Sequence, residues 1–122
     1  MDPIAPEDTA RVLEDAADHI EQVGLARFSS IDRDQQERGI PDDECAVCGL
    51  GAISHAIAGR ADADFTHQEQ AQYDAATVAV RRHLGRSLDL YNDDPGRTAE
   101  DVTAALRATA ARLDAGELDL TA

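Results

Sequence analysis

Alanine supplies much of the apolar content of this chain, and no other feature constrains its fold as strongly. Only 3% of the 122 residues are aromatic, and tryptophan is absent. A core built from small side chains allows helices to approach one another closely. The composition therefore predicts an all-α fold, and a chain of this length can bury a hydrophobic core of its own.

Two helices are predicted in the first half of the chain. The first begins near Pro6, repeats apolar residues at helical spacing and stops at Gly24. The second runs from about residue 43 to 59 and carries glycine and alanine, which would let another helix pack closely against it. Residues 25–43 show no sustained period, and we expect a long irregular segment there, with a short helical turn capped by the serine pair at 29–30.

Two further helices are predicted in the second half, and each begins with a capping box. Thr66 pairs with Glu69, and Thr98 pairs with Asp101, so that each hydroxyl and each carboxylate binds a backbone N–H group. Between these helices, residues 87–91 alternate apolar and polar side chains, which indicates a short extended piece. A proline and a glycine then make a turn before the last helix.

The four helical segments together predict one domain. We expect about four short, alanine-rich helices in a single all-α domain covering residues 1–122, with one long irregular segment between the first two. Residues 1–5 and 117–122 are expected to be frayed tails. Because four short helices bury limited surface, self-association into a homo-oligomer is a further option.

The chain is strongly acidic, with a formal net charge of −14, and it contains no lysine. Direct nucleic-acid binding is not expected, because it relies on basic side chains that displace counterions from phosphates. An acidic domain instead suits a basic surface on a protein partner. No apolar run approaches the ~20 residues needed to span a bilayer, so no membrane association is expected. The N-terminus lacks the basic and apolar regions of a signal peptide, which predicts a cytoplasmic location.

Cys45 and Cys48 form a C-x-x-C motif at the predicted start of the second helix. The two thiols could bind a metal ion or form a redox disulfide, and the alternative is that they are simply buried in the core. Cys48 could also act as a nucleophile if a histidine folded back on it. His19 is expected at the surface or at the boundary of the core. A zinc site would need two more ligands from the histidines of the chain, which are His19, His55, His67 and His83.

A polar turn before the last helix is the second candidate site. Asn92, Asp93 and Arg97 could line a ligand pocket together with Tyr91 and Cys48, with Arg97 holding a carboxylate or a phosphate group. In the structural alternative, Asn92 and Asp93 bond backbone groups of the turn while Arg97 pairs with Asp93. Turns of this kind commonly use such residues, so the sequence favours the structural role.

The chain resembles an uncharacterised family of small proteins from actinobacteria and their phages in three segments that occur in the same order: ARVLEDAADHIEQVG, CGLGAI and YNDDPGRTAEDVTAALRATAA. In that family an alanine-rich first helix ends in Gly-Trp, a Cys-x-x-Gly-Ala helix follows, and a Trp-Asn-Asp turn leads through Arg-Thr into the last helix. The matching residues are Gly24, Cys48, Gly51, Ala52, Asn92, Asp93, Arg97 and Thr98. Leu25 and Tyr91 stand at the two tryptophan positions, and Cys45 lies outside the pattern. The resemblance implies a fold and an origin but no reaction.

We therefore predict a non-catalytic protein-interaction module or accessory factor, whose partner is a host protein if a phage encodes the chain. The first alternative is a small ligand-binding protein or enzyme with a pocket between the Cys48 helix and the Asn92–Arg97 turn. The second alternative is a metal or thiol-redox site at Cys45 and Cys48. The sequence predicts no catalytic residue and no cofactor. Its candidates for binding are Cys48, Tyr91, Asn92, Asp93 and Arg97.

Overall fold

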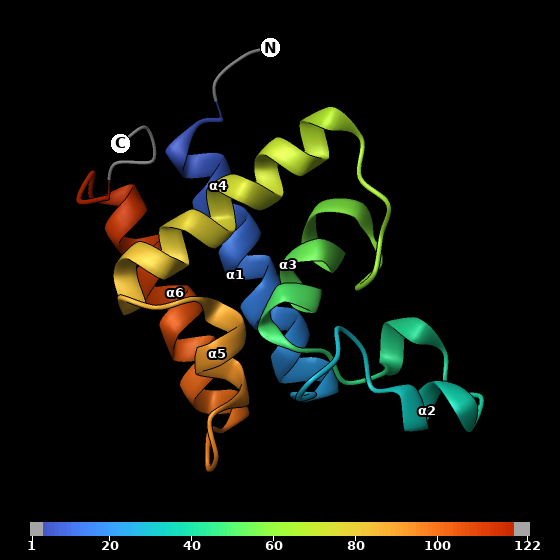
Figure 1. The fold of residues 1–122 in the computed structure, drawn as a ribbon. Coiled ribbons are helices and arrows are strands. Elements are labelled where there is room, and N and C mark those ends of the chain that lie inside the picture. The colour runs from blue at the N-terminus through green and yellow to red at the C-terminus, as the bar shows by residue number, and fades with distance from the viewer. Residues whose placement is uncertain (1–3, 119–122) are drawn as a thin grey trace.

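The computed structural model describes residues 4–118, and the regular structure within them is helical (Figure 1). The elements are α1 (Pro6–Val23), α2 (Arg33–Glu37), the 3₁₀ turn η1 (Asp42–Glu44), α3 (Gly49–Ala58), α4 (His67–Leu84), α5 (Leu88–Asp93) and α6 (Ala99–Asp114). The four longer helices, α1, α3, α4 and α6, correspond to the four predicted ones, and the all-α prediction is confirmed. None of the helices in this part of the chain combines the length and the apolar character that crossing a membrane requires.

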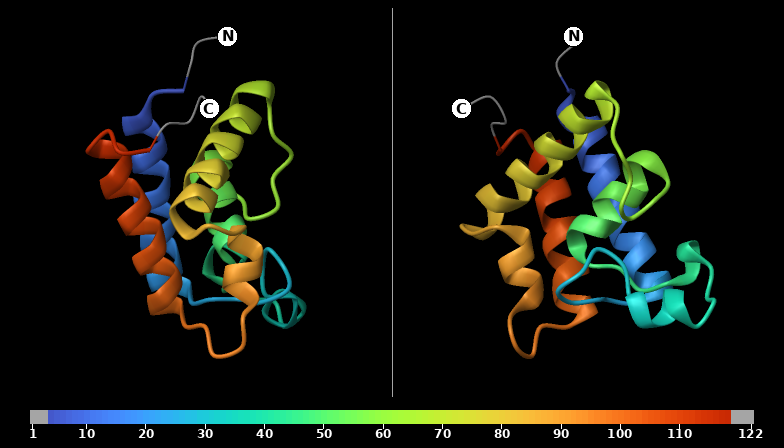
Figure 2. Two further views of the ribbon diagram at one scale, coloured as in Figure 1. Left: turned by 60° about the vertical axis from the view of Figure 1, so that its left-hand side comes forward. Right: turned by 45° about the vertical axis from the view of Figure 1, so that its right-hand side comes forward.

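α1 and α6 lie side by side and run antiparallel (Figure 2). α1 has Pro6 at its first position and ends where Gly24 takes a positive φ of 97°. Two tails, residues 1–5 and 117–122, were expected to fray. Within them, Leu118 packs against the core, and residues 1–3 and 119–122 lie outside the described residues. The buried faces of the two helices carry Ala10, Leu13, Ala16, Ala17 and Ile20 on α1, and Val102, Leu106, Ala110 and Leu113 on α6. Alanine therefore occupies several of the core positions between the helices, as the composition predicts.

α3 and α6 flank α1, and α4 crosses over all three helices (Figure 1). The fully buried face of α4 carries Ala76, Ala79 and Val80. The short helix α5 packs against α3 and α4. It thereby reaches the first residue of α3, Gly49, whose N–H group bonds to Asn92 and against which Leu88 lies.

Both predicted capping boxes are present. The Thr66 hydroxyl accepts a hydrogen bond from the Glu69 N–H (3.1 Å), and the Glu69 carboxylate accepts one from the Thr66 N–H (2.9 Å). Thr98 and Asp101 make the same reciprocal pair at the start of α6, with both bonds at 3.1 Å. α4 ends at Leu84 and is capped by Gly85, where φ is 77°. The starts of α4 and α6 are determined by residues close together in the sequence, which is why the sequence alone predicts them.

The second long helix begins at Gly49, and the prediction that it begins near residue 43 is wrong. The residues just before Gly49 are extended because their backbone groups bond to another segment. The Ala26 N–H donates to the Val47 carbonyl (2.8 Å), and the Val47 N–H donates to the Gly24 carbonyl (3.2 Å). These tertiary hydrogen bonds replace the ones that a helix would make, so the C-x-x-C motif precedes the helix instead of opening it.

The segment expected to be irregular contains a short helix, α2, and the turn η1. α2 is capped by Asp32, whose carboxylate accepts a hydrogen bond from the Gln35 N–H (3.0 Å), and the expected cap from the serine pair at 29–30 is wrong. The Gln35 side chain in turn accepts from the Ala46 N–H (2.7 Å). This hydrogen bond connects α2 to the extended residues that precede α3.

Candidate functional site

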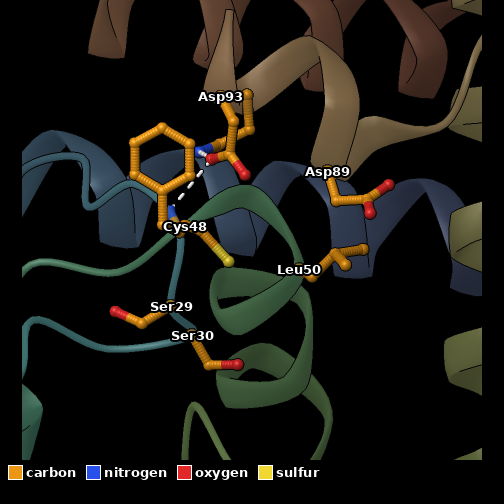
Figure 3. A pocket seen from close by; sticks show the side chains of 8 residues that line it. Ser29, Ser30, Cys48, Leu50, Asp89 and Asp93 are labelled. Carbon is orange, nitrogen blue, oxygen red and sulfur yellow. Dashed lines mark hydrogen bonds between the residues drawn. The ribbon is translucent and has the colours of Figure 1, made fainter.

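A cavity of about 230 Å³ opens between the start of α3, one face of α5 and the loop of residues 28–30 (Figure 3). Asp89 and Asp93 stand on one side of it, and Ser29 and Ser30 stand on the opposite side. Its lining consists of Phe28, Ser29, Ser30, Cys48, Leu50, Asp89, Asn92 and Asp93. The cavity lies between the helix that follows Cys48 and the segment that carries Asn92, which is where the pocket hypothesis placed a site.

α5 forms one wall of the cavity because residues four apart lie on the same side of a helix. Leu88 and Asn92 point into the core, where they are 2% and 1% exposed. Asp89 and Asp93, each one position further along, line the cavity. The prediction of an extended piece at residues 87–91 is therefore wrong. Residues from Leu88 onward form the helix α5, which has one buried face and one acidic face.

Asn92, the only asparagine in the chain, joins three segments of the fold. Its Oδ1 accepts a hydrogen bond from the Gly49 N–H (2.8 Å), which belongs to the first turn of α3 and has no partner within the helix. Its Nδ2 donates to the Ala26 carbonyl (3.0 Å) and to Asp93 Oδ1 (3.0 Å). The structural alternative expected Asn92 to bond within its own turn, but it bonds to segments 43 and 66 positions away. Asn92 therefore positions the walls of the cavity.

Phe28 has a positive φ of 65°, which no other non-glycine residue in the described part of the chain shows. Its side chain is 80% exposed. Its N–H group donates a hydrogen bond to Asp93 Oδ1 (3.1 Å), the same oxygen that accepts from Asn92. α5 thus fixes the backbone of the loop while the aromatic ring stands in solvent at the cavity.

Both cysteines are free and buried. Cys48 caps α3, since its Sγ accepts a hydrogen bond from the Gly51 N–H (3.3 Å). Cys45 Sγ donates to the carbonyls of Ile40 (3.5 Å) and Pro41 (3.4 Å). Burial raises the pKa of the Cys45 thiol and also that of Cys48, although the bond from Gly51 opposes the shift at Cys48. Both thiols are therefore poor sources of the thiolate that metal binding or redox exchange requires.

In the described part of the chain, the histidines do not form a metal site with the cysteines. Within residues 4–118, no group of three or more His, Cys, Asp or Glu side chains is arranged to hold a metal ion. The rings of His19 and His55 instead stack on each other, with centroids 3.7 Å apart and planes 4° from parallel. His19 is 7% exposed, so its expected place at the surface or boundary is wrong. His55 Nε2 lies 3.5 Å from Asp43 Oδ1.

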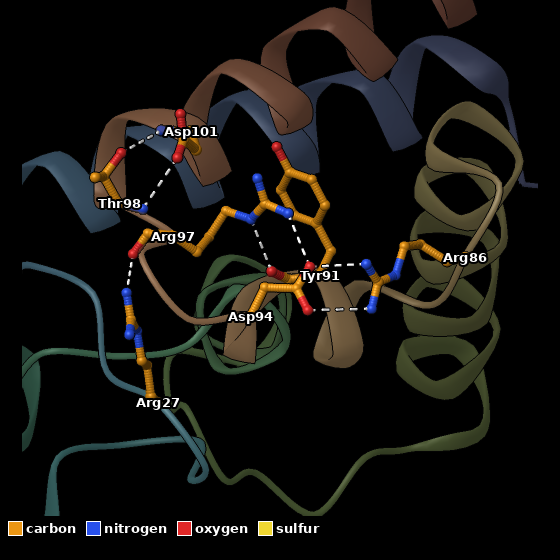
Figure 4. A network of polar contacts seen from close by, with 7 residues as sticks. All are labelled: Arg27, Arg86, Tyr91, Asp94, Arg97, Thr98 and Asp101. Carbon is orange, nitrogen blue, oxygen red and sulfur yellow. Dashed lines mark hydrogen bonds and ion pairs between the residues drawn. The ribbon is translucent and has the colours of Figure 1, made fainter.

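Tyr91 and Arg97 lie outside the cavity lining and form a network of their own (Figure 4). The Arg97 guanidinium lies 3.6 Å from the centroid of the Tyr91 ring, and its Nε donates to the Tyr91 carbonyl (2.9 Å). Arg97 Nη2 also donates to the Asp94 carboxylate (2.9 Å), which Arg86 binds from the other side (2.7 Å). The expected pairing of Arg97 with Asp93 is therefore wrong. With its donors engaged in this way, Arg97 stabilises the turn before α6.

The structure brings together three of the five residues proposed for binding, namely Cys48, Asn92 and Asp93. For Phe28, the available signal was an aromatic residue between an arginine and two serines in a segment without periodicity. Nothing in the sequence reveals its positive φ. The lining residues that sequence reasoning missed are Phe28, Ser29, Ser30, Leu50 and Asp89.

Comparison with known proteins links the chain to one family. The model of a family of unknown function, DUF6197, matches residues 5–112, which extend from the start of α1 into α6 and include the whole cavity lining. Neither the curated proteins nor the solved structures gave a match. By the extent of the family match, the chain belongs to the family of unknown function DUF6197.

Proposed function

We propose that this protein is a non-catalytic interaction module that binds a basic segment of another protein at the cavity between α3, α5 and residues 28–30. The observation that carries the proposal is the exposed Phe28, held at a positive φ beside that cavity. In the complex, the cavity takes an apolar side chain of the partner and the ring of Phe28 packs over it. If an actinobacteriophage encodes the chain, the partner is a host protein.

The conformation of Phe28 is unfavourable in the free protein. A bulky residue at φ 65° costs about 1–3 kcal/mol. Because the side chain is 80% exposed, burial in the core offsets little of this cost. A partner that covers the ring stabilises the complex by about 25 cal/mol for each Å² of apolar surface removed from water. The hydrogen bond to Asp93 accounts for the backbone conformation, whereas binding accounts for a bulky aromatic side chain at this exposed position.

The charge around the cavity favours a basic partner. Asp89 is exposed, and Asp93 accepts both of its hydrogen bonds at Oδ1, which leaves Oδ2 outside these bonds. An arginine or lysine beside the apolar anchor meets these carboxylates at the edge of the interface. The net charge of −14 also attracts basic segments at long range. A second copy of this acidic chain is less favourable as the occupant of this face.

A small-molecule substrate fits the cavity less well than a side chain does. The volume of about 230 Å³ lies below the range of about 300–1,000 Å³ that is usual for small-molecule sites. The polar atoms of Asn92 are already bonded to the protein, and burial raises the pKa of the Cys48 thiol. A nucleophilic or ligand-orienting role for these two residues is therefore disfavoured.

The test is the selection of short random peptides from a displayed library on the wild-type protein and on two variants. Asparagine adopts a positive φ more readily than phenylalanine, so Phe28→Asn should fold and should unfold at the same temperature as the wild type or higher. It should nevertheless lose the selected peptides. Leu90→Ala is the matched control, because Leu90 is 58% exposed but does not line the cavity.

The expected peptides share an apolar residue next to arginine or lysine. They should bind the wild type and Leu90→Ala with similar Kd, and Phe28→Asn at least about tenfold more weakly. Equal binding to Phe28→Asn would place the interaction elsewhere and contradict the proposal. A melting temperature of Phe28→Asn well below that of the wild type would assign Phe28 to folding and remove the main support for the proposal.

A further inference from the structure

A second cavity, of about 240 Å³, adjoins the first one at the surface of α3, α4 and α5. Leu50 and Asp89 line both cavities, so the two share a wall. Figure 3 shows these two side chains on the same side of the first cavity. The remaining lining of the second cavity consists of Tyr73, Thr77, Arg81, Ser87 and Leu88. We call the two cavities together the Leu50 groove; Phe28 lines one half of it and Arg81 lines the other.

The dimensions of the Leu50 groove suit a peptide. Each cavity is smaller than the about 300–1,000 Å³ of a small-molecule site, and Leu50 lies between them. Grooves that recognise peptides commonly offer a row of small pockets, each of which takes one side chain. Tyr73, which is partly exposed, offers an aromatic surface in the second half, as Phe28 does in the first.

The two ends of the groove carry charges of opposite sign. Asp93 lines only the first half, Arg81 lines only the second half, and Asp89 lies on the wall that the two halves share. Arg81 and its neighbour Arg82 both lie in the last turn of α4, where positive charge complements the helix dipole. The dipole explains both arginines equally well, but Arg81 alone of the two lines the groove.

We propose that the segment bound in the Leu50 groove carries charges of both signs in a fixed order. A basic side chain accompanies the apolar anchor in the first cavity, and an acidic side chain accompanies a second apolar anchor and pairs with Arg81. The inference rests on the proposed function and adds the direction in which the segment lies. The reversed segment is rejected, because its basic side chain would face Arg81 and its acidic one would face Asp89 and Asp93.

The test measures Kd by fluorescence anisotropy for a labelled peptide from the selection described above. The same peptide with its acidic residue replaced by arginine serves as the second probe. Arg81→Glu should bind the original peptide about tenfold more weakly and should bind the replaced peptide better than the wild type does. Arg82→Glu is the matched control, because it changes the same charge in the same helical turn outside the groove. It should leave both Kd values unchanged.

The failures of the two proposals are distinguishable. If Arg81→Glu and Arg82→Glu bind the original peptide equally well, the inference about the second cavity is wrong, although Phe28-dependent peptide binding stands. Selected peptides without an acidic residue would overturn it in the same way. If no selected peptide depends on Phe28, the proposed function fails, and the assignment of direction fails with it.

Discussion

At the scale of a single residue, His19 is a buried histidine whose ring stacks on that of His55. His19 Nε2 is buried and has no hydrogen-bond partner among the described residues. Burial lowers the pKa of His19, the charge on His55 lowers it further, and Asp43 opposes the shift. The protonated form of His19 is therefore less favourable in the folded protein than in the unfolded chain.

We predict that the free energy of unfolding decreases as the pH falls below 6.5, the ordinary pKa of histidine. The folded-state pKa of His19 lies lower, so the unfolded chain binds more protons between the two values. The stability is complete above this window and is lost as the pH falls through it. Urea denaturation at a series of pH values measures the effect, and His19→Gln should reduce the slope. Part of the slope should remain, because burial and Arg112 lower the pKa of His83 as well.

The control for this experiment is His67→Gln, which removes an exposed histidine and should keep the wild-type slope. If His19→Gln also kept that slope, the acid sensitivity would come from other groups and the stacked pair would not be its source.

At the same scale, the sequence reveals which residues are chemically notable but not what they bond to. Asn92 and Asp93 stand out as polar residues beside a turn. Their partners Ala26 and Phe28 lie 66 and 65 positions away, and no local pattern reports such contacts. The positive φ of Phe28 also follows from these long-range bonds, which is why the residue was missed.

At the scale of elements, two glycines show how closely other segments approach α3. A Cβ atom at Gly51 would lie 2.1 Å from the Ser30 carbonyl oxygen, which is itself bonded to the Cys48 N–H (3.3 Å). A Cβ atom at Gly49 would lie 2.9 Å from the end of the Leu88 side chain. The sequence predicts that these glycines let another helix pack closely against α3. At Gly51 the segment that packs closely is instead the loop that carries Ser30. A backbone oxygen fixed in this way can move less than a leucine side chain can.

We predict that Gly51→Ala destabilises the protein by about 3 kcal/mol, because the loop that carries Ser30 must shift. Gly49→Ala should cost about 1 kcal/mol or less, since Leu88 can adjust and alanine favours the helix. Urea denaturation of the two variants measures the difference. Equal losses of stability would contradict the close approach of this loop to α3.

The elements that could be predicted are those whose ends are decided locally. α4 and α6 begin at capping boxes and α1 ends at a glycine, and the sequence reveals all three signals. The start of α3 and the existence of α5 depend instead on tertiary contacts. Extended residues before Gly49 pair with the loop around Ala26, and α5 forms where Leu88 and Asn92 can both be buried.

At the scale of the whole molecule, the net charge of −14 opposes the packing of α1 against α6 unless it is offset locally. Arg107 on α6 provides this offset. It binds Glu14 (2.6 Å), Asp18 (2.9 Å) and Glu21 (2.8 Å), three carboxylates along α1. The hydrogen bonds that Arg107 donates to the carboxylates of Glu21 and Asp18 raise its pKa further, so that the guanidinium stays charged. One arginine thus holds together three groups that would otherwise repel one another across the main helix pair.

We predict that Arg107→Gln lowers the free energy of unfolding by about 1–2 kcal/mol at low salt, which is the sum expected for a small network of partly exposed ion pairs. Arg11→Gln, which breaks one exposed pair with Asp8 on α1, is the matched control and should cost less than about 0.5 kcal/mol. Added salt shortens the screening length to about 3 Å at 1 M. It therefore weakens the attraction between Arg107 and the three carboxylates in the wild type, and also the repulsion among those carboxylates in the variant. The gap in melting temperature between Arg107→Gln and the wild type should therefore narrow as salt is added. A gap that stayed constant would mean that Arg107 stabilises the helix pair through packing of its aliphatic chain and not through its charge.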